Sequence, residues 1–175
     1  MPQVFETPSP RLAPVLHYVI ARSDGLGFGA IKLNKAVVRA DVEFFRRYGK
    51  TITGAESFQK QRLGPVPNGV VKALKRLTDE AKIAPRNVLT PAGERNEYAA
   101  LAEPDISRFT SAEVDVINLS ISYLQRLSAS RASEETHDAL WDEIDLAGQI
   151  PVKAAAFPPA PIDEETLAWA LEGAR

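Results

Sequence analysis

The sequence predicts a mainly α-helical fold: a single compact helical domain with a small β-hairpin or short-strand element. Three observations predict it. The length of 175 residues suits one domain with appendages. Several segments repeat apolar residues every three to four positions, most clearly from Ile31 to Tyr48. The strand-like patterns are short and lie among glycines and prolines.

The first helix is expected to follow an N-terminal arm of residues 1–8. Ser9 and Pro10 suit the N-cap and the first helical position, and apolar spacing continues to Ile20. The glycine-rich run 23–29 then ends the helix. It lacks both a preceding strand and a following Gly-Lys-Ser/Thr, so a flexible connection is expected rather than a phosphate loop.

The segment from Ile31 to Tyr48 is predicted to be the central helix. It carries two neighbouring apolar stripes, which together are too wide for a lone surface helix. Gly49 follows as a stop signal. Residues 57–62 alternate weakly between polar and apolar, which suggests a short strand.

The sequence from Gly64 to Pro67 is predicted to be a rigid loop. Proline fixes its own φ and restricts the residue before it. Asn68 suits the N-cap of a third helix that continues to Leu77. Residues 83–103 are expected to form a β-hairpin or an irregular excursion.

Capping signals mark the later helices. Thr110 and Glu113 have the spacing of a capping box. Ser133 suits the cap of a short acidic helix that ends near Ile144, and Asp163 suits the cap of a last amphipathic helix.

The Ala/Pro tract 153–161 is expected to be a semi-extended linker before that last helix. The expected organisation is therefore an arm at 1–8, a domain at 9–150, and a linker with a C-terminal amphipathic helix at 151–175.

The composition excludes several classes of protein. The chain has no cysteine, which excludes disulfides, thiolate catalysis and cysteine-bound metals. It has no run of about 18 apolar residues that could span a membrane. Its start does not match a secretory signal, so a cytoplasmic protein without a membrane partner is expected.

No active site or cofactor site is predicted. Glu134 and His137 form one Glu-x-x-His pair, whereas a di-iron bundle needs two such pairs and further carboxylates. Neither histidine lies in a recognisable nucleophile motif. The chain is therefore expected not to be an enzyme and to hold no cofactor or metal.

Charge is distributed unevenly along the chain. Residues 31–86 contain 13 Lys and Arg against 5 Asp and Glu, whereas residues 87–175 contain 6 against 16. The two parts neutralise each other across the fold, or each meets a partner of opposite charge, or they are simply two solvated faces. A nucleic-acid footprint is conceivable on the basic residues Lys32, Lys35, Arg39, Arg46, Arg47, Lys72, Lys75 and Arg76. The whole-chain pI is about 5.8, and the basic region is expected to lack exposed aromatic residues for stacking on bases, so nucleic acid is an unfavoured partner.

Four short motifs occur in a specific order. They are Lys-Leu-Asn-Lys at 32–35, Ala-Asp at 40–41, Arg-Tyr-Gly-Lys-Thr-Ile-Thr-Gly at 47–54 and Gly-Pro-Val-Pro at 64–67. This set resembles the Panacea domain, the SocA-like antitoxin domain of bacteria and phages. Ser133, His137 and Trp141 match the end of that domain more loosely.

The resemblance implies a non-enzymatic antitoxin that neutralises a cognate toxin protein by direct binding. It also implies that such a protein can act as an adaptor that passes its toxin to a cellular AAA+ protease. The alternatives are a DNA-binding transcriptional regulator that uses residues 31–86, or a phage-associated interaction protein. The oligomeric state is left open.

The candidate partner-binding or signature residues are Lys32, Lys35, Asp41, Tyr48, Gly64, Pro65 and Pro67. Asp41 is expected to accept N–H bonds from the loop at 52–54 or from the loop at 64–67, a structural role that we favour over contact with the toxin. The two lysines lie at a helix start, where the dipole disfavours cations. That placement suggests a partner carboxylate or a salt bridge to the acidic part of the chain. Partner specificity is expected in the arm 1–5 and the tail 162–171.

Overall fold

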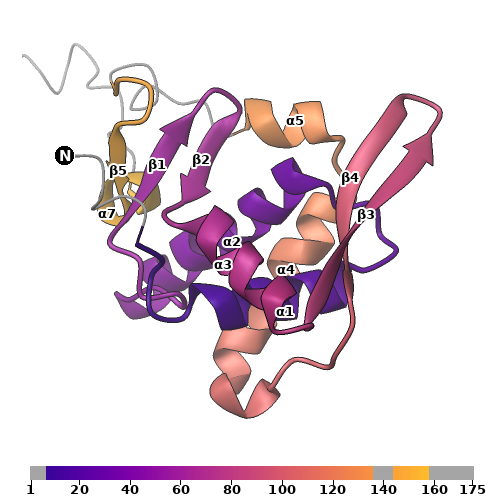
Figure 1. Ribbon diagram of the computed structural model, residues 1–175. Coiled ribbons are helices and arrows are strands. Elements are labelled where there is room, and N and C mark those ends of the chain that lie inside the picture. The colour runs from indigo at the N-terminus through magenta and orange to yellow at the C-terminus, as the bar shows by residue number, and fades with distance from the viewer. Residues whose placement is uncertain (1–6, 136–143, 158–175) are drawn as a thin grey trace, which may run out of the picture.

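The computed structural model describes residues 7–135 and 144–157. Its four longest helices are α1 (Leu12–Ser23), α2 (Ala30–Tyr48), α3 (Val70–Asp79) and α4 (Ser111–Gln125). Helix α2 contacts α1, α4 and two short helices nearer the C-terminus, so the predicted central helix is confirmed (Figure 1). The apolar faces of α1 to α4 enclose the main hydrophobic core.

Helix α2 ends where the sequence predicted. Gly49 adopts a left-handed φ of 69°, and its N–H donates to the carbonyl of Phe45 at 2.8 Å. A glycine reaches this conformation without the steric cost that a Cβ imposes. Helix α1, in contrast, begins at Leu12 rather than at Ser9 and Pro10. The N–H of Arg11 donates to the carbonyl of Thr53, which holds that residue outside the helix.

A three-stranded antiparallel sheet lies beside α2. Its strands are β1 (Ser57–Gln61), β2 (Gly64–Pro67) and β5 (Gln149–Pro151), in the order β2-β1-β5. The predicted strand at 57–62 is thus confirmed. The expectation of a rigid loop at 64–67 is wrong, because these residues pair with β1. The prolines fit there because β2 is an edge strand, where a missing N–H removes no hydrogen bond from the sheet interior.

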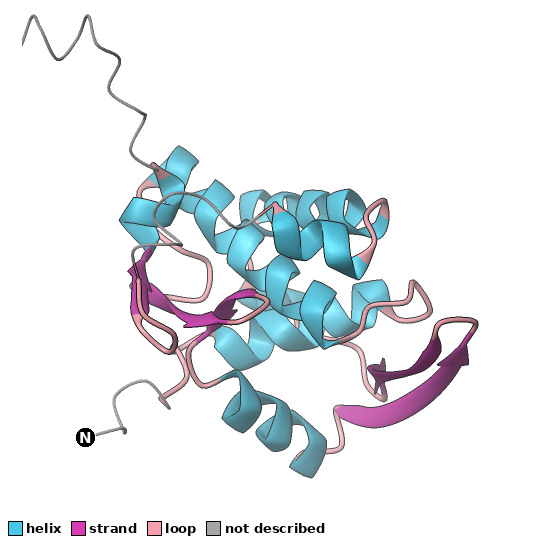
Figure 2. Ribbon diagram, turned by 90° about the horizontal axis from the view of Figure 1, so that it is seen from above, coloured by secondary structure: helices cyan, strands magenta, loops and turns pink. Residues whose placement is uncertain are grey.

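The second sheet is the expected hairpin, made of β3 (Ile83–Thr90) and β4 (Gly93–Ala100). It projects from the helical body in both ribbon views (Figures 1 and 2). An isolated bridge between Gly29 and Glu97 attaches it to the start of α2.

The structure is a mixed α/β fold: of the residues it describes, about 49% are helical and 20% lie in strands, which form two sheets of three and two strands. The expectation of a mainly α fold with one small β element is therefore wrong. Two facts hid the larger sheet. Prolines occupy half of β2, and β5 pairs with β1 from about 90 residues away in the sequence. Local periodicity carries no information about such a distant partner.

Two expected helix caps take other roles. Asn68 precedes α3, but Gly69 is the N-cap residue, and the Asn68 amide bonds instead to Ser57 and Gln149 across the sheet. Ser133 lies inside α5 (Ala129–Glu134), whose N-cap is Ser128. The Ser133 hydroxyl donates to the carbonyl of Leu63. The capping box of Thr110 and Glu113 on α4 is confirmed; a 3-10 turn (Ile106–Arg108) precedes it.

The chain beyond β5 begins as a helix rather than as an extended linker. Residues Val152–Ala156 form α7, which packs against α2. Arg46 donates to the carbonyl of Ala156 at 2.7 Å. Residues 1–6, 136–143 and 158–175 lie outside the described part, and so do most of the predicted acidic helix and the last amphipathic helix. The division of the chain at 8 and 150 stays a prediction.

The close approach of Pro8 to Gly69 gives a test of this packing. Gly69 has φ +73°, and a Cβ there would lie 2.4 Å from the backbone nitrogen of Pro8. We expect Gly69→Ala to lower the free energy of unfolding by about 3 kcal/mol, the sum of left-handed strain and overpacking. Gly25 has φ +79° with no atom within 4 Å, so Gly25→Ala should cost only about 1–2 kcal/mol. Urea unfolding measures the loss in both variants. Equal losses would show that residues 7–8 move away from position 69 at little cost.

Candidate partner-binding surface

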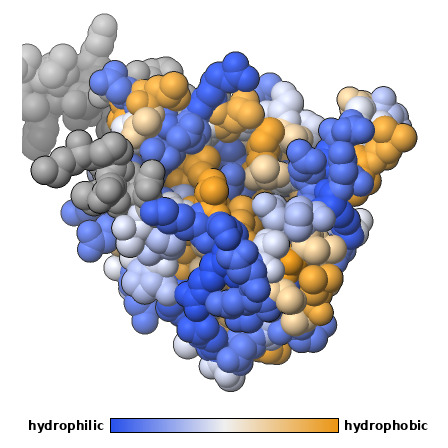
Figure 3. Space-filling view, viewed as in Figure 1, coloured by the Kyte–Doolittle hydropathy of each residue, from blue (hydrophilic) through white to orange (hydrophobic). Residues whose placement is uncertain are grey.

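Two of the sequence motifs meet at one groove. The N-terminal half of α2 supplies Ala30, Ile31 and Lys35, and the β1–β2 hairpin supplies Leu63, Pro65 and Val66. Together with three polar neighbours they line a cavity of about 280 Å³, which we call the signature groove. Figure 3 shows hydrophobic surface beside this hairpin. The motif at 32–35 and the motif at 64–67 thus form the two walls of one largely apolar hollow.

The two signature lysines differ in their surroundings. Lys35 is a buried part of the groove wall, and burial lowers its pKa to about 8. Lys32 lies on another side of α2, with its ammonium 5.5 Å from the centre of the Phe28 ring. Burial and the nearby charge of Arg95 lower the pKa of Lys32. The sequence predicted the same role for both lysines at the start of α2, but only Lys35 lines the groove.

The hairpin residues act through backbone shape. Gly64 closes the β1–β2 turn with φ +121°, where a side chain would be strained. Pro65 faces the groove, and Pro67 pairs with Phe58 on β1. Tyr48, at the far end of α2, stacks on Phe44 with ring centres 4.4 Å apart. Thirteen residues separate it from Lys35, about 20 Å along the helix, so it does not belong to the groove.

Asp41 fixes the loop that follows α2. Its Oδ1 accepts the N–H groups of Ile52 at 2.8 Å and of Thr53 at 2.9 Å, and its Oδ2 accepts the hydroxyl of Thr53. The carboxyl is 1% exposed. The structure therefore shows contact with the 52–54 loop, one of the two loops that the sequence suggested. Burial raises the pKa of Asp41 to about 6, although the Thr53 and Ile52 hydrogen bonds oppose the shift.

Arg11 extends this connection to α4. Its guanidinium forms a paired contact with Glu113, at 2.6 and 3.0 Å, and donates to the carbonyl of Arg108. The Glu113 carboxylate also accepts the N–H of Thr110. The hydrogen bond to Arg11 lowers the pKa of Glu113 and raises that of Arg11. The start of α1, the loop after α2 and the start of α4 are thereby joined.

Sequence reasoning missed the contribution of Leu63 to the groove. The side chain is 46% exposed at the tip of the β1–β2 hairpin. Its signal in the sequence was a large apolar residue between Arg62 and Gly64, in a turn where polar residues are the rule. The carbonyl of Leu63 accepts from Ser133, so α5 supports the turn from behind.

Comparison with known families identifies the domain. The family model described as "Antitoxin SocA-like, Panacea domain" matches residues 33–142. The chain belongs to this family. The resemblance found in the sequence is therefore confirmed. Searches of curated proteins and of solved structures gave no match.

The match to the Panacea domain covers Lys35, Asp41, Tyr48, Gly64, Pro65 and Pro67. Lys32 lies one residue before its start. Helix α1 also precedes the matched range, although Leu12, Val15 and Leu16 are fully buried in the main core.

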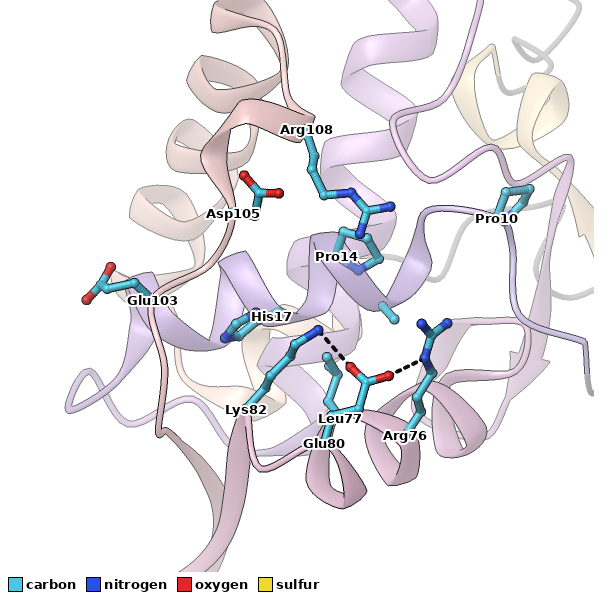
Figure 4. Close-up of a pocket in the computed structure, with 11 residues that line it drawn as sticks. Pro10, Pro14, His17, Arg76, Leu77, Glu80, Lys82, Glu103, Asp105 and Arg108 are labelled. Atoms are coloured by element: carbon cyan, nitrogen blue, oxygen red, sulfur yellow. Dashed lines mark hydrogen bonds and ion pairs between the residues drawn. The ribbon is translucent and has the colours of Figure 1, made fainter.

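A second, polar hollow of about 130 Å³ lies between α1, α3 and the segment after β4 (Figure 4). The Glu80 carboxylate points between Lys82 and Arg76 and contacts both at 2.7 Å. Their hydrogen bonds lower its pKa to about 2, far from the range that favours proton transfer near neutral pH. The His17 ring is engaged by the carbonyl of Ala102 at 2.9 Å. Glu80 and His17 are thus each held by partners at the rim of the hollow.

Among the residues that the structure describes, no helix combines the length and apolar character needed to cross a bilayer. Nor does the same part of the chain bring together three His, Asp or Glu side chains that could hold a metal ion. His137, the predicted partner of Glu134, lies outside the described residues.

Replacing Asp41 tests its hold on the loop. We expect Asp41→Ala to lower the free energy of unfolding by about 3 kcal/mol, because two buried N–H groups lose their acceptor. Asp105 makes a similar pair of bonds to Ser107 on the exposed surface, so Asp105→Ala should cost far less. Chemical unfolding at pH 7.5 compares the two. Similar losses would contradict a special role for Asp41.

The raised pKa of Asp41 predicts a pH dependence. Between pH 4 and 6 the folded protein retains a proton that the unfolded chain has lost, so the Asp41 contribution to stability falls as pH rises. Asp41→Asn removes this titration. The stability of wild type relative to Asp41→Asn should therefore fall by up to about 3 kcal/mol over that window and stay level above pH 7. A constant difference would mean that the carboxyl is ionised throughout.

Proposed function

We propose that this protein is an antitoxin that neutralises a cognate toxin protein by direct binding. The observation that carries the proposal is the match of the SocA-like Panacea family model to residues 33–142. The geometry supports it, since two separate signature motifs meet at one largely apolar groove with an exposed leucine at its edge. A partly exposed apolar hollow with a rigid rim suits an apolar side chain of a partner protein.

The groove is well prepared for binding a partner. One wall is the β1–β2 hairpin. Its strand β2 contains two prolines and pairs with β1, and Ser133 on α5 donates to the carbonyl of Leu63 at the hairpin tip. The other wall is the central helix. A surface that is already ordered loses little conformational entropy when a partner binds, which improves affinity for a given contact area.

A non-enzymatic role in the cytoplasm follows from this proposal. The protein acts by covering a surface of its toxin, and Lys35, Pro65 and Leu63 contribute to the contact. The arm 1–5 and the tail 162–171 supply further specificity for the individual toxin. Presentation of the bound toxin to a AAA+ protease is a second step that the same binding permits.

The DNA-binding alternative receives less support. Lys75 and Arg76, two residues of the suggested footprint, form ion pairs with Asp79 and Glu80 at 2.6 and 2.7 Å. Arg46 pairs with Glu43 and also donates to the carbonyl of Ala156. A cation that is already paired with a carboxylate displaces few counterions from DNA phosphates. Helix α3 is therefore a weak DNA-binding surface.

Co-expression with the adjacent reading frame tests the proposal. We expect the neighbouring gene to inhibit growth, co-expression to restore it, and the two proteins to co-purify. Leu63→Asp should weaken the complex at least tenfold, because a carboxylate replaces an apolar contact at the groove. Leu89→Asp is the matched control, since Leu89 is 82% exposed on the projecting hairpin.

Binding constants for the two variants separate the outcomes. Normal binding by Leu89→Asp with loss in Leu63→Asp supports the groove. Equal binding by both variants would place the toxin elsewhere on the surface. A neighbour that neither inhibits growth nor binds would contradict the antitoxin function itself.

A further inference from the structure

A second groove runs between α2 and α4, on a side of α2 that the signature groove does not use. Its cavity of about 290 Å³ is lined by Arg39 and Arg47 from α2 and by Val116, Leu119 and Arg126 from α4, among others. We call it the arginine groove. Leu119 is 59% exposed, so the hollow combines an accessible apolar side chain with three cations.

The three arginines are not neutralised within the described protein. Across residues 7–135 and 144–157, none of them forms an ion pair with a carboxylate. The guanidinium of Arg39 instead lies 3.8 Å from the centre of the Tyr123 ring. Two carboxylates lie at the groove: that of Glu43 is held by Arg46 at 2.7 Å, and that of Glu135 accepts the hydroxyl of Tyr123. With three arginines against these two carboxylates, one of which is paired with Arg46, the groove presents an excess of positive charge.

The spacing of the cations suits a helix. Arg39 and Arg47 are eight residues apart on α2, a distance of about 12 Å along its axis. Two turns of a partner helix cover almost the same length, so carboxylates seven or eight residues apart would meet both arginines. An apolar residue between them would contact Leu119. Guanidinium groups bind carboxylates through two parallel hydrogen bonds, which adds geometric selectivity.

We propose that the arginine groove binds an acidic amphipathic helix of a partner protein. The charge complementarity and the exposed leucine both support this occupant. Nucleic acid fits less well for two reasons. Phosphates make no favourable contact with the apolar side chains of the groove, and the exposed carboxylate of Asp115, one residue before Val116, repels them. The groove is separate from the signature groove, so this binding does not depend on neutralisation of a toxin.

Fluorescence anisotropy on the full chain tests the proposal directly. The probe is a labelled synthetic helical peptide with leucines every three to four residues and glutamates between them. We expect the wild-type chain to bind it and the affinity to fall as salt is raised. The double variant Arg47→Glu with Arg126→Glu should bind at least tenfold more weakly.

The control carries the same change of charge elsewhere. Arg22 and Lys153 are exposed and line neither groove, so Arg22→Glu with Lys153→Glu should retain binding within about twofold. Circular dichroism melting establishes that both double variants are folded. Leu119→Ser should weaken binding without changing the salt dependence, because it removes only the apolar contact.

Three kinds of result would overturn the proposal. The first is a failure of selective binding, seen either as no binding of the peptide by the wild-type chain or as equal losses in both double variants. The second is tighter binding of a duplex DNA of matched charge that is lost in the groove variant, which would assign the groove to nucleic acid. The third is a wild-type dimer in sedimentation that the groove variant dissociates, which would assign it to a second copy of the chain.

Discussion

The buried carboxyl of Asp41 determines how the chain is arranged around α2. By accepting the N–H groups of Ile52 and Thr53, it holds the loop between the central helix and β1. The carbonyl of Thr53 in turn accepts the N–H of Arg11, where α1 begins. One side chain of α2 therefore holds the loop that leads to β1 and, through Thr53, contacts the start of α1. The arrangement is costly, since a carboxyl removed from water needs several donors to replace its hydration. Three such donors are present.

With these elements held, α2 offers different surfaces to different neighbours. Its N-terminal half and the β1–β2 hairpin enclose the signature groove, whereas residues from Arg39 to Arg47 border α4 and the arginine groove. Near the end of α2, Phe45 contacts the Phe157 ring and Arg46 donates to the carbonyl of Ala156, both at the end of α7. A helix in contact with so many elements has little freedom to move by itself. Both grooves are therefore preformed surfaces, which is the property a binding protein needs for high affinity with modest contact area.

The sequence predicted the features that depend on neighbouring residues. Apolar spacing identified α2, Gly49 its end, and Thr110 with Glu113 the start of α4. The ordered motifs identified the family, and Asp41 was correctly associated with a loop. Features that depend on distant residues were missed. The pairing of β5 with β1 and the use of Asn68 as a cross-sheet donor arise only in the folded chain. The groove could be anticipated only in part, because helical spacing does not specify which face of α2 the hairpin covers.

Ion pairs within the fold explain part of the uneven distribution of charge along the chain. Much of the basic excess of residues 31–86 is neutralised close by, as Lys75, Arg76 and Lys82 pair with carboxylates on α3 or at its end. Arg86 reaches across the hairpin to Glu97 and back to Asp24. Within the described residues, Arg39, Arg47 and Arg126 form no such ion pair. The guanidinium of Arg39 lies over the Tyr123 ring, whose hydroxyl donates to Glu135. Unneutralised charge on a rigid surface costs stability through repulsion, and a partner carboxylate relieves that cost when it binds. The helix proposed for the arginine groove would supply such carboxylates.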